Sequence, residues 1–232
     1  MPSKIHNFFP LSILQEQIEL TSEEKNELIS EIRIMKERSQ NSNFREGYFG
    51  WTGDVNGHEF IFKNIKFNKL FLEIKTKIIN YLQFLKIDLD QIEIYIQRSW
   101  ATISNEREII SKHKHLQSHL SFAYYLKKST KDANFVVYDE EKKNEFIPGL
   151  FSSSTLHKKN LIKEISIATA SKISIKVNEN DIVIFPSKTL HSTEQIDSNN
   201  ERISISGDIV FLAKDSSMLE HLMPNFEDWK KL

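Results

Sequence analysis

The stretch QIEIYIQRSWATI, residues 91–103, decides the fold class of this chain of 232 residues. Ile92, Ile94 and Ile96 alternate with polar or aromatic side chains, which is the two-residue period of a β-strand with one buried face. The chain before this stretch has the three-to-four spacing of amphipathic helices instead. We therefore expect a change from helical to β structure near residue 90.

Strand-like runs recur after this point, separated by turn-forming segments such as KSTKDAN, NEND and DSNNE. A string of short strands preceded by helices predicts a mainly β protein with flanking α-helices, either a β-barrel or a two-sheet jelly roll. The runs are HLSFAYYLKK (119–128), NFVVYDE (134–140), EISIATASKISIKVN (164–178), DIVIFPS (181–187) and RISISGDIVFLA (202–213).

The first 90 residues predict a mostly helical N-terminal elaboration. Apolar residues separated by Glu, Lys and Gln predict a helical section over residues 11–38, in which Thr21 or Ser22 caps a helix start. Residues 67–87 predict a second amphipathic helix. Residues 41–60 predict a packed loop, with a lid or substrate wall as the alternative. We expect a single domain over 1–232, with its β core at 91–214 and a tail at 215–232 that folds back.

Composition excludes several classes of site. The chain has no cysteine, which removes disulfides, thiolate nucleophiles and Cys-ligated metals, so any metal must be held by nitrogen and oxygen. A formal net charge of -1 does not indicate a nucleic-acid partner. No apolar run approaches the roughly 20 residues needed to span a bilayer. We expect a soluble, cytoplasmic protein; the sequence leaves its oligomeric state open.

Three of the eight histidines lie within SKHKHLQSH, residues 111–119. On an extended chain His113 and His115 project to the same side, where two imidazoles suit divalent iron, zinc or copper. This H-x-H pattern alone is weak evidence. His115 and His119 also have the spacing of a zincin helix, but Leu116 stands where that motif needs its glutamate, so we interpret His119 as a structural loop residue.

A third ligand and an anion-binding group have candidates further along the chain. His191 follows the apolar run DIVIFPS, whose FPS makes a rigid break. In RISIS, Arg202 and Ser204 share one strand face. Arg202 either lies on the solvent-exposed face of an edge strand or provides a rigid guanidinium group that binds a carboxylate.

These segments together resemble the 2-oxoglutarate- and Fe(II)-dependent oxygenases, in the branch whose signature runs H-x-H, YY, FPS, H and RISIS. The likeness covers roughly residues 92–212, and GYFGWTGDVNG matches the branch's upstream segment more loosely. The matching segments are SW (99–100), HKH (113–115), SFAYYL (121–126), IFPSKTLHS (184–192) and RISIS (202–206).

The resemblance implies a double-stranded β-helix, a cupin-like jelly roll, with iron near one mouth. His113 and His191 match the two histidine ligands of the family, and His115 stands where most of the superfamily has Asp or Glu. We therefore expect three-histidine coordination, with one positive charge more than the usual site; a non-protein ligand or an inactive site are the alternatives.

The co-substrate residues also follow from the resemblance. Arg202 matches the arginine that binds the distal carboxylate of 2-oxoglutarate, Ser204 its hydroxyl partner, and Tyr124 a tyrosine that contacts the same carboxylate. Tyr125 would point away and pack. The resemblance supplies no catalytic residue beyond the metal centre.

The implied function is a dioxygenase that uses Fe(II) and 2-oxoglutarate, stimulated by ascorbate, and hydroxylates an unidentified small-molecule or peptide substrate with release of succinate and CO2. The alternative is a non-catalytic, cupin-like metal- or ligand-binding module, which the missing carboxylate favours. A three-histidine dioxygenase that needs no keto acid is a third option, but such an enzyme would not require an arginine at position 202 to bind a carboxylate.

Overall fold

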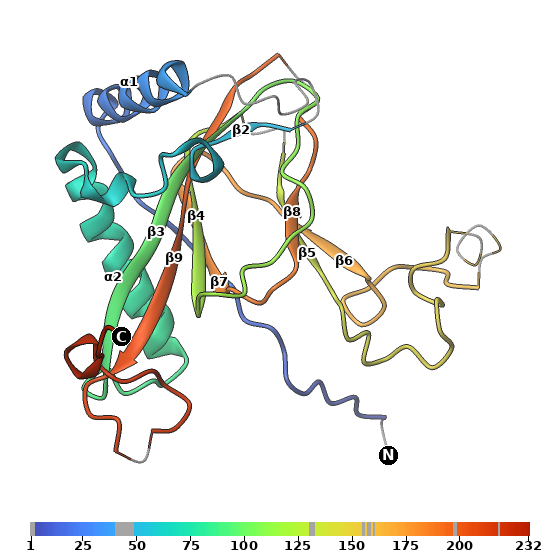
Figure 1. Ribbon diagram of the computed structural model, residues 1–232. Coiled ribbons are helices and arrows are strands. Elements are labelled where there is room, and N and C mark those ends of the chain that lie inside the picture. Colours follow the sequence, from blue (N-terminus) through green and yellow to red (C-terminus); the bar gives the residue numbers. More distant parts are fainter. Residues whose placement is uncertain are drawn as a thin grey trace.

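Two antiparallel β-sheets form the body of the protein in the computed structural model, which describes residues 3–39, 49–129, 133–154, 156, 159, 161–196, 199–217 and 219–232. The larger sheet has the strand order β1-β7-β4-β9-β3-β2, and the smaller has the order β6-β5-β8 (Figure 1). The strands are β1 (Leu14–Gln17), β2 (Trp51–Thr52), β3 (Ile92–Ser104), β4 (Leu120–Lys127), β5 (Phe135–Tyr138), β6 (Lys172–Ile175), β7 (Asp181–Pro186), β8 (His191–Thr193) and β9 (Arg202–Ala213).

Helices cover the outer face of the larger sheet (Figure 1). Helix α1 (Ser22–Arg38) begins at a capping box, in which the Thr21 hydroxyl accepts from the Glu24 amide and the Glu24 carboxylate accepts from the Thr21 amide. Helix α2 (Asn68–Phe84) confirms the helix predicted over 67–87. Short 3-10 turns complete the set: η1 (Asp54–Asn56), η2 (Ile61–Lys63), η3 (Ile65–Phe67) and η4 (Phe226–Asp228).

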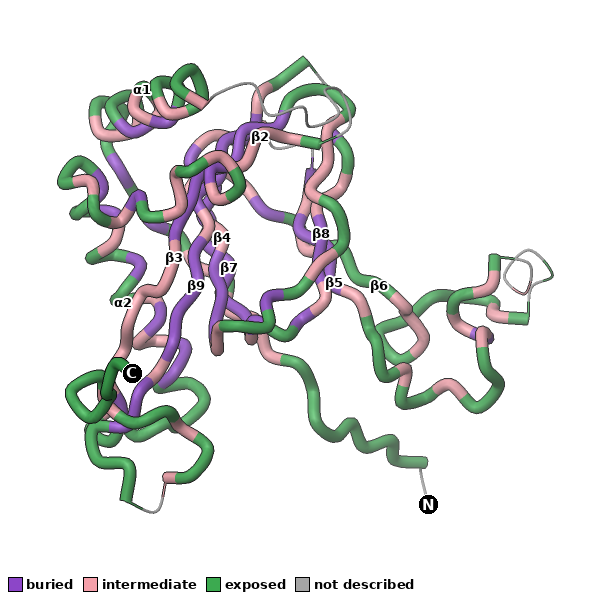
Figure 2. Tube along the Cα trace, in the orientation of Figure 1, coloured by how far each residue is buried: buried purple, intermediate pink, exposed green. Residues whose placement is uncertain are grey.

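One hydrophobic core lies between these helices and the larger sheet, and a second lies between the two sheets. The buried residues of both appear in purple in Figure 2. The first core joins the apolar stripes of both helices to alternate residues of the strands, among them Leu28, Ile32, Leu70, Ile74, Ile184, Ile203 and Ile205. The second core is smaller and consists of Tyr125, Phe135, Val137, Val177, Val183 and Phe185.

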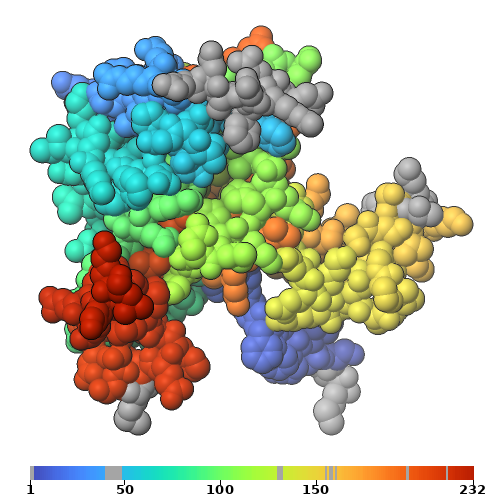
Figure 3. Space-filling view, viewed as in Figure 1, coloured from blue at the N-terminus to red at the C-terminus, as the bar shows by residue number. Residues whose placement is uncertain are grey.

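Two local predictions are wrong. The helical section expected from residue 11 begins instead at Ser22, because Leu14–Gln17 pairs with β7 as an edge strand and the Gln15 side-chain Nε2 donates to the Asp181 carboxylate. Those four residues are too few for their period to separate strand from helix. The run 164–178 forms strand only at Lys172–Ile175, and the described part of residues 139–171 projects as an arm (Figure 3, yellow).

The architecture is the predicted one: a mainly β jelly roll with flanking helices. The tail also returns to the body, since the Ala213 amide donates to the Met223 carbonyl and the Phe226 ring packs edge-on against Tyr95 at 4.9 Å. Of the loop predicted over 41–60, residues 41–48 lie outside the described residues. Trp51 of its remainder extends the larger sheet as part of β2.

Candidate metal centre

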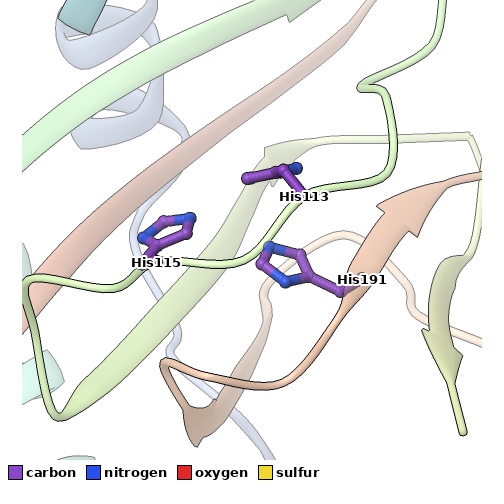
Figure 4. A group of neighbouring side chains, drawn as sticks. All are labelled: His113, His115 and His191. Atoms are coloured by element: carbon purple, nitrogen blue, oxygen red, sulfur yellow. The ribbon is translucent and has the colours of Figure 1, made fainter. Parts of the chain in front are cut away.

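Three histidines meet at one end of the gap between the sheets. His113 and His115 lie on the connection from β3 to β4, and His191 is the first residue of β8. One ring nitrogen of each lies within 4.8 Å of the other two, and the rings surround a common space (Figure 4). His113 and His191 form an antiparallel bridge in which each amide donates to the other's carbonyl at 2.9 Å. The backbone itself thus joins the two ligand-bearing segments.

Each imidazole is fixed through its Nδ1 atom. Nδ1 of His113 lies 2.7 Å from the Ser111 carbonyl oxygen, and Nδ1 of His191 lies 2.8 Å from the Thr189 carbonyl oxygen. Nδ1 of His115 is hydrogen-bonded to the Asp208 carboxylate. An acceptor at Nδ1 requires the proton there and leaves Nε2 with a free lone pair. All three rings are therefore set in the tautomer that binds a metal through Nε2.

Burial favours the neutral form of His113 and His191, which is the form that metal ligands must take. Desolvation lowers the pKa of His191 to about 3, with the neighbouring His113 as a further cause. Desolvation also lowers the pKa of His113. A set of neutral imidazoles without sulfur suits divalent iron, zinc or copper. The residues present therefore fit the ferrous ion that the sequence implies.

The three histidines line a cavity of about 240 Å³ between the sheets. Its wall from the larger sheet includes Thr102 and Ser204, and its wall on the other side includes Phe135. Arg98 and Asp54 also line it, and their side chains approach to 3.9 Å. The cavity combines an apolar wall with a few polar groups, which is typical of a small-molecule site.

Arg202 is buried beside this cavity and does not line it. Its side chain is 2% exposed and lies on the same face of β9 as Ser204, and Nη2 donates to the Ser104 hydroxyl at 2.9 Å. Nε and Nη1 are buried and have no hydrogen-bond partner among the described residues. A buried guanidinium with two open donors fits an incoming carboxylate, such as that of 2-oxoglutarate.

The two neighbouring tyrosines of β4 lie on the opposite strand faces from those predicted: Tyr125, and not Tyr124, faces the cavity. Tyr124 faces the helix side, and its hydroxyl donates to the Ile18 carbonyl at 3.1 Å. Tyr125 lines the cavity instead. Burial raises its pKa to about 12, an effect that the nearby Arg202 opposes. The reason is the register of β4, which pairs Tyr125 with Ser204 on the cavity face.

Sequence reasoning overlooked Asp208 and its hydroxyl partners. This carboxylate has no exposed surface, and the hydroxyls of Ser118 and Ser121 donate to the same oxygen that binds His115. A signal for it existed: Asp208 follows Ser204 and Ser206 at the two-residue period of the cavity face of β9. His119 lies in the loop before β4, as expected, where its Nδ1 accepts from the Phe211 amide at 3.0 Å.

Solved structures share this fold. The alpha ketoglutarate dependent carbocyclase SnoK from nogalamycin biosynthesis is 12% identical, with a TM-score of 0.55 over 92% of this chain and 87% of that chain. HygX from Streptomyces hygroscopicus, solved with nickel and 2-oxoglutarate, is 12% identical, with a TM-score of 0.51 over 96% and 87%. A Pseudomonas putida prolyl-4-hydroxylase is 10% identical, with a TM-score of 0.51 over 86% and 92%. At these identities the likeness shows the fold alone.

The sequence matches one family model over slightly less than half of its length. Residues 98–208 match the family model described as "Putative 2OG-Fe(II) oxygenase". No curated protein matches the sequence. Among the described residues, no helix is long and apolar enough to cross a membrane. The matched segment contains the three histidines and all of β4, and together with the shared jelly roll it supports the resemblance to the 2-oxoglutarate- and Fe(II)-dependent oxygenase superfamily.

Proposed function

We propose that this protein is a dioxygenase that binds Fe(II) through His113, His115 and His191 and hydroxylates a small-molecule or peptide substrate. One oxygen atom of O2 enters the substrate and the other enters 2-oxoglutarate, which leaves as succinate and CO2. Bound iron with the keto acid supplies the oxidising power for an unactivated C–H bond. The observation that carries the proposal is the convergence of three ring nitrogens within 4.8 Å in the wall of a cavity.

Arg202 is the proposed anchor for the distal carboxylate of 2-oxoglutarate. Its guanidinium is buried, and two of its nitrogens have no hydrogen-bond partner among the described residues. Ser204 adds a hydroxyl on the same strand face, and Tyr125, which lines the cavity, takes the role first expected for Tyr124. These groups would orient the co-substrate toward the histidines, while the aromatic wall at Phe135 and Phe185 excludes water.

The test is succinate formation from 2-oxoglutarate with added Fe(II) in air, with and without ascorbate. Turnover of the keto acid without the true substrate is expected at a low rate, and a His191→Ala variant should abolish it. Candidate substrates are then compared by mass, since an added oxygen atom identifies hydroxylation. The carbocyclase SnoK has the same fold, so ring closure without added oxygen is a distinguishable outcome.

Binding experiments separate this enzyme from a module that only holds a metal. With Ni(II) in place of Fe(II), calorimetry should show 2-oxoglutarate binding to the wild-type protein and not to the His191→Ala variant. Metal binding without any 2-oxoglutarate binding or succinate release would contradict the proposal and favour the non-catalytic module.

A further inference from the structure

Asp208 is the one carboxylate among the described residues that is hydrogen-bonded to a histidine of the metal cluster. The other two histidines bind neutral backbone carbonyls at the same ring position. His115 is also the histidine that stands in the place of the usual carboxylate ligand. The negative charge missing from the ligand set is thus present one hydrogen bond behind it.

The surroundings of Asp208 hold this carboxylate in one orientation. Its Oδ1 atom accepts from His115 Nδ1, from Ser121 at 2.9 Å and from Ser118 at 3.2 Å. Ser187 extends the network, because its hydroxyl lies 2.8 Å from that of Ser121. These contacts connect β4, β9 and the turn that follows β7 behind a single imidazole. A ring held in this way cannot turn its Nε2 atom away from the other two.

The charge on Asp208 is incompletely balanced by the described residues. Its Oδ2 atom is buried without a hydrogen-bond partner, and Arg98 Nε approaches only to 3.5 Å. Arg98 also lies between Asp54 and Glu59, at 3.9 and 3.8 Å, so three carboxylates share one guanidinium. A fully buried carboxylate is unfavourable unless positive charge compensates it. A dication on the far side of His115 would provide that charge.

We propose that Asp208 is a positioning residue that orients His115 for metal binding and supplies, through the Nδ1 hydrogen bond, the negative charge that a carboxylate ligand would otherwise bring. The inference rests on the metal centre of the proposed function. Under this proposal, three neutral imidazole nitrogens contact the ion, and the Asp208 carboxylate contacts His115 and not the ion itself.

The test compares Asp208→Asn with Asp181→Asn. Asp181 is a matched control because it is also a buried carboxylate with several hydrogen bonds, but its partners are Gln15, Gln17 and Asn178. Co(II) affinity is measured by competition with a chelator, and the visible spectrum of bound Co(II) reports the ligand field. We expect Asp208→Asn to weaken Co(II) binding by about 10- to 100-fold and to change the spectrum. Asp181→Asn should leave both unchanged.

The outcomes separate this inference from the proposed function. A wild-type protein that binds no Co(II) overturns both. Wild-type binding that persists at the same affinity and with the same spectrum in Asp208→Asn overturns only the role of Asp208. If Asp208→Asn does not fold, Ser121→Ala decides, since it removes one donor to the carboxylate and leaves the carboxylate in place. A smaller loss of Co(II) affinity is then expected, and unchanged affinity would overturn the inference.

Discussion

The two faces of strand β9 differ in what they contribute to the protein. Ile203, Ile205 and Ile209 point toward the helices and are buried in an apolar cluster. Arg202 and Asp208 lie on the other face and are equally buried, yet each retains polar atoms without a partner among the described residues. Neighbouring residues of one strand are thus equally buried, but burial of the apolar side chains stabilises the folded protein, whereas burial of the charged groups destabilises it. The helix face stabilises the fold, and the cavity face keeps charge available at some cost to stability.

The largest effect should come from Ile205→Ala, which opens a cavity on the helix face. Ile205 has no exposed surface, and removal of such a side chain costs about 2–5 kcal/mol. Urea denaturation measures the loss. Co(II) affinity of the protein that remains folded should be unchanged; a marked fall in that affinity would show that the two faces are not separable.

Arg202→Met tests the cavity face, where we expect a residue to contribute to 2-oxoglutarate binding and not to the free energy of unfolding. Loss of a buried charge-assisted contact should raise the 2-oxoglutarate concentration for half-saturation by at least about 30-fold, equivalent to about 2 kcal/mol. The free energy of unfolding should stay the same or rise, because a partly unpaired guanidinium is replaced by an apolar chain of similar length. Succinate assays and urea denaturation measure the two effects. Unaltered co-substrate dependence would contradict the role of Arg202.

The adjacent tyrosines offer a smaller, paired comparison. Tyr124→Phe removes a buried hydrogen bond to Ile18 and should lower the free energy of unfolding by about 1 kcal/mol without changing 2-oxoglutarate binding. Tyr125→Phe should do the reverse and weaken 2-oxoglutarate binding by about 0.5–1.5 kcal/mol. Calorimetry in the presence of Ni(II) measures the second effect. An exchange of these two results would restore the assignment made from sequence.

The smallest effect concerns pH. Burial lowers the pKa of His119, whose neutral Nδ1 accepts from the Phe211 amide. The unfolded chain takes up a proton near the ordinary pKa of about 6.5, before the folded protein does, so this contribution to stability is complete above that pH and declines below it. Urea denaturation from pH 7.5 down to pH 5.5 should show a shallower decline for His119→Gln than for the wild type. Equal slopes would exclude this contribution.

Sequence periodicity predicted most of the strands and both helices because these elements carry long, regular apolar patterns. It failed at Leu14–Gln17, where pairing with β7 outweighs a local pattern only four residues long. It also misassigned the tyrosine pair, because alternation says that Tyr124 and Tyr125 face opposite ways but not which of them faces the cavity. That choice depends on the register with β9, which is a property of the folded protein.

Within the site, the histidine trio could be predicted because a resemblance linked residues 113–115 with a position far along the chain. Asp208 could not be found in the same way, because its role depends on a contact across 93 positions that no motif contains. Its place at the two-residue period of RISISGD was visible, yet periodicity does not state which hydroxyls and rings lie opposite.

The paired backbone hydrogen bonds between His113 and His191 have one more consequence. Their carbonyl and amide groups satisfy each other whether or not an ion is present, so the scaffold of the site is assembled during folding. Loading with metal then requires little rearrangement of the main chain. A chelator should strip the ion and leave a folded apoprotein that reloads at once, in contrast to small zinc domains that unfold when their metal is removed.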